Sequence, residues 1–241
     1  MVSIKRNAKG EFAEAKGLRV RKTSIYEPGQ KEVFKISRSK FSNFMDCERC
    51  FYLDRVKGLQ EPGMPGWSLN TTVDDLLKKE FDLYRERKEP HPIFERYNLN
   101  FIPFQHEDID KWRNSLSGGI SYHDKDMNII LQGGIDDVWF NLDTNQIVVA
   151  DYKAQSTKIN PEKNYYLNGT YHQSYKMQMD IYVYILRKMG FDVSDTSYFM
   201  VCNGEKNGDR FDAKMNFSIT LIDYDTNTNW ISEKIIKMKS V

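Results

Sequence analysis

One short run of the sequence, Ile147-Val148-Val149-Ala150-Asp151-Tyr152-Lys153, constrains the fold more than any other. Its first four residues are apolar and mostly β-branched, which is typical of a buried strand. Because side chains alternate along a strand, Asp151 and Lys153 point to the same side, about 7 Å apart. Burying a charge costs free energy unless it is paired or binds a metal, so the end of this strand is a candidate site. The alternative is a surface salt bridge at a fraying strand end.

A second carboxylate stands on the preceding predicted strand, in the run Gly133-Gly134-Ile135-Asp136-Asp137. Asp136 and Asp151 can then face each other across the ladder between the two strands. Two carboxylates at this spacing repel each other unless a cation lies between them, and hard divalent ions prefer oxygen ligands. The pattern predicts a Mg²⁺ or Mn²⁺ site beside Lys153.

The remaining periodicities predict a mixed α/β domain with one central β-sheet flanked by helices. Apolar residues at three- and four-residue spacings indicate helices over 39–56, 70–88, 108–115, 171–189 and 230–239. Short runs rich in Ile, Val, Phe and Trp indicate strands over 128–131, 135–141, 147–153, 196–202 and 215–222. We expect the first three of these strands to form a meander.

The charge is unevenly distributed along the chain. The total is 35 basic against 34 acidic residues, but residues 1–40 hold eleven Lys or Arg against four Glu, a local charge of +7. The other residues therefore hold 24 basic and 30 acidic side chains, a net charge of −6. We expect a basic N-terminal arm over residues 1–35, which could meet a polyanion or be a solvated tail, and one domain over residues 36–241.

Three further features predict a cytoplasmic protein. No apolar run approaches the roughly 20 residues of a bilayer-spanning helix. The basic start of the chain is not followed by the apolar segment of a secretory signal. Three cysteines are too few for a disulfide framework and fit a reducing compartment.

Taken in order, three motifs resemble a known family. They are Gly134-Ile135-Asp136, Asp151-Tyr152-Lys153, and Gln178-Met179-Asp180-Ile181-Tyr182, which begins 25 residues after Lys153. Their order and spacing resemble the RecB-like branch of the PD-(D/E)XK nuclease superfamily. Upstream, the stretch from Ser39 to Leu53 resembles the opening helix of such nucleases. The resemblance covers residues 37–190 and implies a restriction-endonuclease-like core with a central mixed β-sheet.

The resemblance also implies a function and a role for each motif residue. The expected activity is Mg²⁺-dependent hydrolysis of DNA phosphodiesters, as an exonuclease or an endonuclease, in DNA repair, recombination, or phage or CRISPR-type DNA processing. Asp136 and Asp151 would bind the metal, the carbonyl of Tyr152 would join them, and Lys153 would orient or help to deprotonate the attacking water. Gln178 and Tyr182, on one helical face, would pack against the site and reach the DNA strand, or else form a polar stripe on a core helix.

The sequence departs from the family pattern at one position of the first long helix. The family commonly carries a metal-binding His there, and this chain has Asp74. Because Asp is itself a hard-metal ligand, Asp74 is a further candidate ligand. The same replacement is compatible with a weakened site, so a nuclease-fold DNA-binding module that acts with a partner is the alternative function. A different metal-dependent hydrolase, or a structural domain, is a second alternative.

The cysteines do not fit the iron–sulfur cluster of some relatives, which uses one cysteine before the core and three after it. Only Cys47, Cys50 and Cys202 are present, so we expect no complete cluster within one chain. A zinc site at Cys47 and Cys50, joined by Cys202 and a histidine, is a weaker alternative.

Lysines interleaved with tyrosines follow the Asp-Tyr-Lys motif. Lys158, Lys163 and Lys176 can neutralise phosphates, and tyrosine rings can stack on unpaired bases. We therefore expect a DNA partner that is single-stranded or has a free end, together with a helicase or other processing protein. Aromatic residues at this density are also found in ordinary cores.

Overall fold

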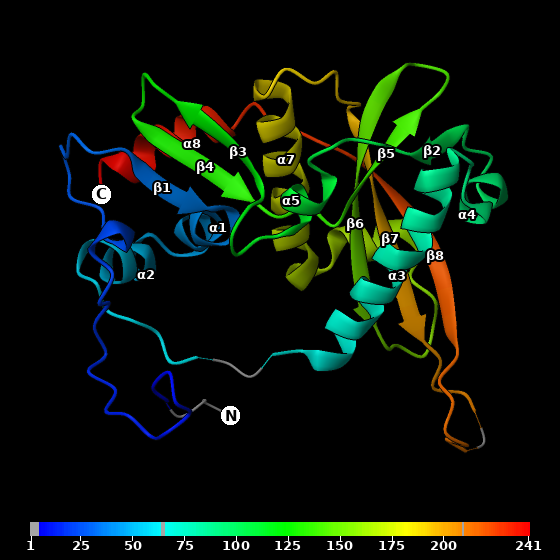
Figure 1. Cartoon of the computed structure of the whole chain (residues 1–241), viewed down its shortest axis with the longest axis horizontal. Helices are drawn as coiled ribbons and strands as arrows, with labels where there is room; N and C mark the ends of the chain where they lie inside the picture. The colour runs from blue at the N-terminus through cyan, green and yellow to red at the C-terminus, as the bar shows by residue number, and fades with distance from the viewer. Residues whose placement is uncertain (1–4, 64–65, 209) are drawn as a thin grey trace. The chain divides into compact units, whose positions relative to one another are not determined.

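The computed structural model describes residues 5–63, 66–208 and 210–241 (Figure 1). The chain divides into two compact units. The first comprises Met1–Ser68, His123–Gln132 and Trp230–Val241, and the second comprises Leu69–Tyr122 and Gly133–Asn229. Each sheet has helices packed against it, so the protein is of the α/β class. Within the described ranges, no helix has both the length and the apolar character that crossing a membrane requires.

The first unit contains most of a small three-stranded sheet in the order β1-β4-β3. Strand β1 (Phe34–Ser37) pairs in parallel with β4 (Ile129–Gly133), and β3 (Ile120–Asp124) lies on the other side of β4. The helical elements of this unit are η1 (Lys22–Ser24), α1 (Arg38–Asp46), α2 (Glu48–Phe51), the π-helical turn η2 (Tyr52–Val56) and α8 (Ile231–Lys239).

The helix predicted over residues 39–56 is interrupted in the structure. The hydroxyl of Ser37 accepts a hydrogen bond from the Lys40 amide and caps α1, which ends where Cys47 adopts an extended conformation, at φ −160° and ψ 99°. The sulfur of Cys47 accepts a hydrogen bond from the Cys50 amide and begins α2. The apolar periodicity continues across this break, which is why the sequence alone predicts a single helix.

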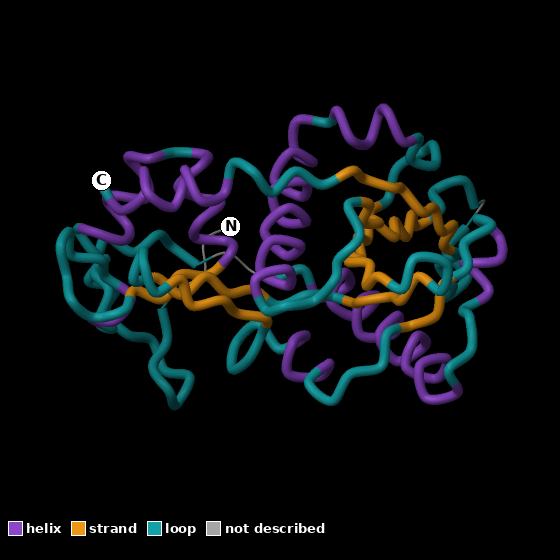
Figure 2. Tube along the Cα trace, turned by 90° about the horizontal axis from the view of Figure 1, so that it is seen from above, coloured by secondary structure: helices purple, strands orange, loops and turns teal. Residues whose placement is uncertain are grey.

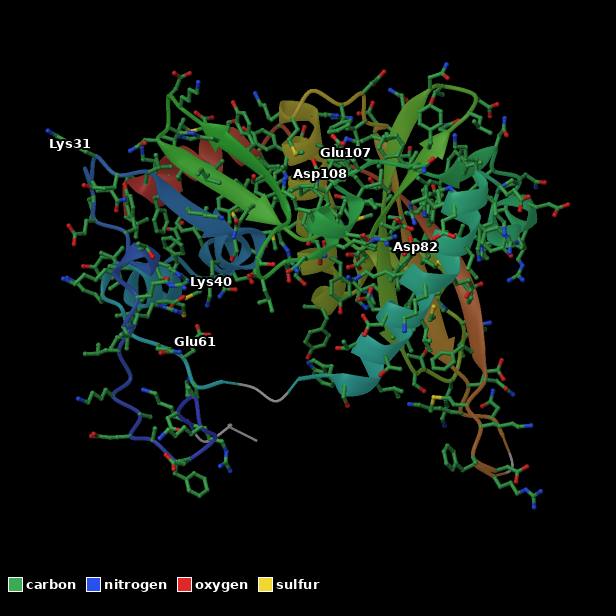
Figure 3. The ribbon with its side chains drawn as sticks, in the orientation of Figure 1. Lys31, Lys40, Glu61, Asp82, Glu107 and Asp108 are labelled. Atoms are coloured by element: carbon green, nitrogen blue, oxygen red, sulfur yellow. The ribbon has the colours of Figure 1, made fainter. Side chains whose placement is uncertain are left out.

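Part of the basic charge of residues 1–40 is neutralised within the first unit. The buried carboxylate of Asp54 forms ion pairs with Arg19, with Lys40 at 2.9 Å and with Arg55 at 3.2 Å. Burial alone would raise the pKa of Asp54, but Lys40 and Arg19 outweigh it and lower that pKa. Two of the eleven basic residues before position 41 therefore balance an internal charge. Figure 3 labels Lys40 on α1.

The second unit contains a five-stranded mixed sheet in the order β2-β5-β6-β7-β8. The central strands β6 and β7 are parallel, and the other pairs are antiparallel. The strands are β2 (Phe101–Pro103), β5 (Asp137–Asn141), β6 (Gln146–Gln155), β7 (Thr196–Gly204) and β8 (Phe217–Asp225). The helices are α3 (Ser68–Arg87), α4 (Pro92–Arg96), α5 (Ile109–Arg113), α6 (Lys163–Asn168), η3 (Thr170–His172) and α7 (Gln173–Lys188). Figure 2 shows these helices on both sides of the sheet.

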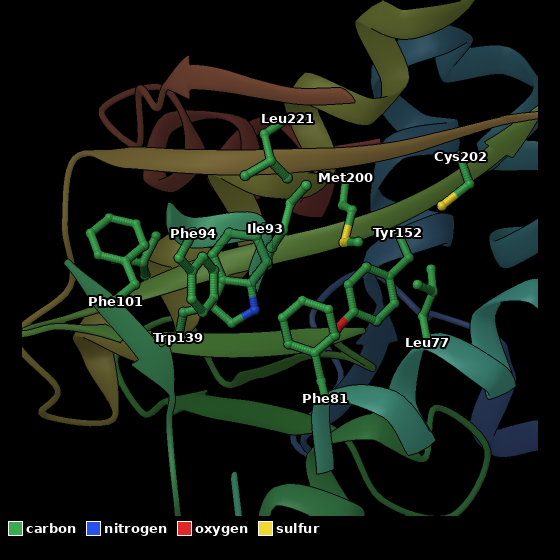
Figure 4. Close-up of a cluster of buried hydrophobic side chains, with 12 residues drawn as sticks. Leu77, Phe81, Ile93, Phe94, Phe101, Trp139, Tyr152, Met200, Cys202 and Leu221 are labelled. Atoms are coloured by element: carbon green, nitrogen blue, oxygen red, sulfur yellow. The ribbon is translucent and has the colours of Figure 1, made fainter. Parts of the chain in front are cut away.

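Aromatic packing fixes α3 against one face of this sheet. The ring of Phe81 on α3 lies 5.7 Å from the ring centroids of both Trp139 on β5 and Tyr152 on β6. Figure 4 shows these side chains in one buried cluster with Leu77, Met200 and Leu221. Burying large aromatic side chains supplies most of the driving force for such a cluster. It holds the middle of α3 beside strand β6.

The predicted meander is wrong in its first strand. Residues 129–133 form β4 and belong to the three-stranded sheet, whereas β5 and β6 form an antiparallel pair in the five-stranded sheet, with Val138 opposite Val149. The chain therefore changes sheets between Gly133 and Asp137. Local strand propensity does not distinguish a hairpin turn from such a crossing, and the prediction of a single central sheet is also wrong.

Candidate active site

The second half of strand β6 holds an ion pair whose carboxylate is fully buried. The side chain of Asp151 has no exposed surface, and its Oδ2 forms an ion pair with the Lys153 ammonium, whose side chain is 16% exposed. Asp151 Oδ1 accepts a hydrogen bond of 2.6 Å from Gln178 Nε2 on α7. The prediction that Asp151 and Lys153 share one side of a strand is confirmed. The alternative of an exposed salt bridge at a fraying strand end is wrong.

Asp136 stands at the start of β5, beside Asp151. The strand register pairs Asp137 with Ala150, which brings Asp136 level with Asp151. Asp136 Oδ2 accepts a hydrogen bond of 2.9 Å from the Tyr152 amide. The two carboxylates therefore lie together at one end of the β5–β6 pair.

Gly134, in the same motif, is required by a close approach of the backbone. A Cβ atom at this position would lie 2.7 Å from Ser115 Cβ, a distance that real side chains do not tolerate. The absence of a side chain lets the segment before Asp136 pass the loop after α5. The glycine thus sets the path of the chain into the site.

The helix α3 brings a third carboxylate to this cluster. Lys78 Nζ lies 2.6 Å from Asp74 Oδ2 and 3.9 Å from Asp136 Oδ1. Asp74, at the position where the resembled family carries a His, therefore neighbours Asp136. Lys78 was not predicted, although its spacing of four residues from Asp74 is a recognisable helical ion-pair pattern.

The charges in the cluster shift the pKa values of its members. Burial, reinforced by the charge of Asp136, raises the pKa of Asp151 to about 7 despite the opposing charge of Lys153. Burial and the charge of Asp136 likewise raise the pKa of Asp74. Burial disfavours the ammonium of Lys153, but Asp151 and Asp136 outweigh it and raise its pKa. The site therefore combines crowded carboxylates with a stable positive charge.

A buried polar network lies behind these residues, and the sequence did not predict it. Asp137 Oδ1 forms ion pairs with Arg85 and, at 3.0 Å, with Arg113, while Asp137 Oδ2 accepts a hydrogen bond of 2.7 Å from the Tyr152 hydroxyl. Arg113 Nε also donates to the Asp136 carbonyl at 3.2 Å. Arg113 and Arg85 both reach Asp82, which Figure 3 labels on α3. The network fixes the backbone of Asp136 and the ring of Tyr152.

The candidate DNA-binding residues on α7 lie behind the carboxylates. Gln178 and Tyr182 are both buried, and Gln178 Nε2 lies 3.1 Å from the Tyr182 hydroxyl. Their predicted packing against the site is confirmed through the Gln178–Asp151 hydrogen bond. Their predicted contact with DNA stays a prediction, as does the predicted role of the Tyr152 carbonyl.

The three candidate lysines have different surroundings. Lys158 lines a cavity beyond the end of β6. Lys163 forms an ion pair with Asp223, and Lys176 Nζ donates to the Leu167 carbonyl at 3.4 Å. Of the three, Lys158 has the surroundings best suited to meeting a ligand.

The carboxylate cluster has the donor chemistry that a hard divalent ion requires. Over residues 5–63, 66–208 and 210–241, no three His, Cys, Asp or Glu side chains are already grouped as the ligands of an ion, at the cysteines or elsewhere. The ammonium groups of Lys78 and Lys153 pair with the three carboxylates instead. Asp74 Oδ1 is nevertheless buried and accepts no hydrogen bond from any residue that the structure describes. An unsatisfied carboxylate oxygen beside two further carboxylates fits Mg²⁺ or Mn²⁺.

Comparison with protein-family models and with curated proteins finds no match to this chain. The functional assignment therefore rests on the residues and on the geometry of the second unit.

Proposed function

We propose that this protein is a Mg²⁺-dependent deoxyribonuclease whose second unit is a restriction-endonuclease-like core. The observation that carries the proposal is the fully buried Asp151, held by Gln178 and Lys153 beside Asp136. A folded protein gains nothing in stability from crowding carboxylates in this way, since desolvation opposes it. Perturbed ionisable groups gathered at a strand end are a common feature of catalytic sites.

The roles of the residues follow from their charges and positions. Asp136 and Asp151, with Asp74 beside them, would hold the metal. When bound, a divalent ion lowers the pKa of water and offsets negative charge on a phosphate. Lys153, whose pKa is raised, keeps its proton and stabilises the charge that develops on the phosphate during attack. Gln178 positions Asp151 by fixing its Oδ1.

The proposed reaction is hydrolysis of a phosphodiester. The oxygen of a water molecule bonds to phosphorus, and the bond from phosphorus to one sugar oxygen breaks. The departing oxygen receives the proton that the water loses, so one DNA end keeps the phosphate and the other gains a hydroxyl. We propose repair, recombination, or phage or CRISPR-type DNA processing as the setting, with a helicase or similar partner.

The proposal is tested by incubating the purified protein with end-labelled DNA that carries single-stranded overhangs. We expect cleavage with Mg²⁺ or Mn²⁺, loss of cleavage with excess chelator, and recovery when the metal is returned. Asp136→Asn should cleave far more slowly than wild type. Asp143→Asn, which alters an exposed carboxylate in the β5–β6 turn, should behave as wild type. Cleavage that is equal in the presence of chelator, or in Asp136→Asn, would refute the proposal.

The position of Lys78 favours one second candidate. Its ammonium contacts both Asp74 and Asp136, so the lysine can replace a cation in holding the cluster together. The protein would then be a DNA-binding module that acts with a partner nuclease. That function predicts DNA binding that survives chelation and Asp151→Asn, without cleavage under any metal condition.

A further inference from the structure

A cavity of about 570 Å³ opens where the chain leaves β6 and enters α6. Its volume is within the roughly 300–1,000 Å³ typical of small-ligand sites. The lining residues lie within residues 155–166, with His172, the last residue of η3, as the one addition.

Two stacked rings form a rigid wall of this cavity. The centroids of Tyr166 and His172 lie 4.0 Å apart with an angle of 26° between the ring planes. His172 Nδ1 lies 2.7 Å from the Tyr166 carbonyl, which fixes the imidazole in place. Tyr166 is only 1% exposed, and its hydroxyl has no hydrogen-bond partner within the described part of the chain. Tyr165, by contrast, is 80% exposed and supplies an accessible aromatic face at the rim.

The same aromatic wall continues to the carboxylate cluster. His172 stacks on Tyr175 at 5.4 Å, and Lys153 Nζ lies 4.6 Å from the centroid of the Tyr175 ring. Burial, reinforced by the charge of Asp151, raises the pKa of the Tyr166 hydroxyl. A ligand in the cavity therefore lies next to the residues proposed to hydrolyse a phosphodiester.

The chemistry of the cavity matches one part of a nucleic acid. Aromatic faces stack on any base, and the ammonium of Lys158 complements a phosphate attached to that base. The cavity is also lined by polar side chains, among them Gln155, Thr157 and Asn160, that can meet the edge of a base. A base inside a duplex is paired and stacked, and it cannot present its faces to such a wall.

We propose that this cavity is a subsite for an unpaired nucleobase, which places the adjoining phosphate of a single strand at the carboxylate cluster. This inference rests on the proposed nuclease function and gives its substrate as single-stranded DNA or a frayed end. Tyr165 closes over the base, and Lys158 binds the phosphate beyond it. The three-residue turn η3 holds His172 behind Tyr166.

The test uses the full-length chain, fluorescently labelled single-stranded DNA, and Ca²⁺ in place of Mg²⁺ so that binding is measured apart from cleavage. Tyr165→Ala is expected to weaken binding roughly 5- to 150-fold, which corresponds to the loss of one stacked base. Tyr171→Ala removes a tyrosine that is 88% exposed, lies six residues away and does not line the cavity. It should weaken binding less than about twofold.

Oligonucleotides that carry abasic sites complete the test. Wild type should bind a fully abasic strand at least as weakly as Tyr165→Ala binds the normal strand, and Tyr165→Ala should cause no further loss on the abasic strand. Equal losses at Tyr165 and Tyr171, or no loss at Tyr165, would overturn the subsite. If the binding data overturned the subsite but cleavage still depended on Lys153, the proposed nuclease function would stand. Base-dependent binding without any metal-dependent cleavage would support the subsite and refute the nuclease.

Discussion

Replacing Lys153 with alanine is expected to lower the rate of DNA hydrolysis by at least about 100-fold, the usual cost of removing one preorganised group that stabilises transition-state charge. Its ammonium is paired with Asp151 and retains its proton. Without this ammonium, the carboxylates of Asp136 and Asp151 repel the negative charge that develops on the phosphate, and one positive charge that offsets it is lost. The rate should be measured on end-labelled DNA at saturating Mg²⁺.

Two further variants separate catalysis from folding in this experiment. Lys188→Ala removes an exposed lysine at the end of α7 and should cleave at the wild-type rate. Lys153→Met keeps the aliphatic stem and should be as inactive as Lys153→Ala, with wild-type binding to single-stranded DNA in Ca²⁺ as the readout of folding. Cleavage by Lys153→Ala at the wild-type rate would show that the assignment of Lys153 is wrong.

Replacing Asp137 with alanine is expected to lower the free energy of unfolding by about 3–5 kcal/mol, the cost of breaking a buried ion pair. Asp137 has no exposed surface and holds the guanidinium groups of Arg85 and Arg113. Its loss removes the negative charge that offsets these two guanidinium groups. It also removes the acceptor of the hydrogen bond that the Tyr152 hydroxyl donates. Urea unfolding followed by tryptophan fluorescence measures the change.

A matched exposed ion pair provides the control. Asp195 pairs with Arg187 at 2.6 Å, but its side chain is largely exposed. Asp195→Ala should therefore cost less than about 1 kcal/mol. A similarly small decrease in the free energy of unfolding for Asp137→Ala and Asp195→Ala would mean that the Asp137 network does not stabilise the second unit.

The sequence best predicted those features that depend on residues close together in the chain. The alternation of a strand was enough to place Asp151 and Lys153 on one side of β6, and the spacing of apolar residues was enough to locate α3, α7 and α8. Asp74 was found only through the resemblance to a family pattern. Its contact with the cluster depends on how Phe81 packs α3 against the sheet.

Long-range partners could not be predicted from local patterns. Asp137 meets Arg85 and Arg113 across separations of 52 and 24 residues, and no periodicity links such positions. For the same reason the sequence assigned residues 128–131 to the wrong sheet. The charge count also included Arg19 and Lys40 in the basic segment that could meet a polyanion, although both pair with Asp54. Charge counts along a chain do not reveal which charges are paired after folding.

The most direct test of the metal-dependent site is a crystal structure of the full chain with Mn²⁺, analysed by the anomalous scattering of manganese. We expect one peak at coordination distance from the carboxylates of both Asp136 and Asp151, with Asp74 turned toward it and the Lys153 ammonium moved off Asp151. A peak elsewhere, or none while Lys153 remains paired with Asp151, would contradict the proposed metal-dependent nuclease.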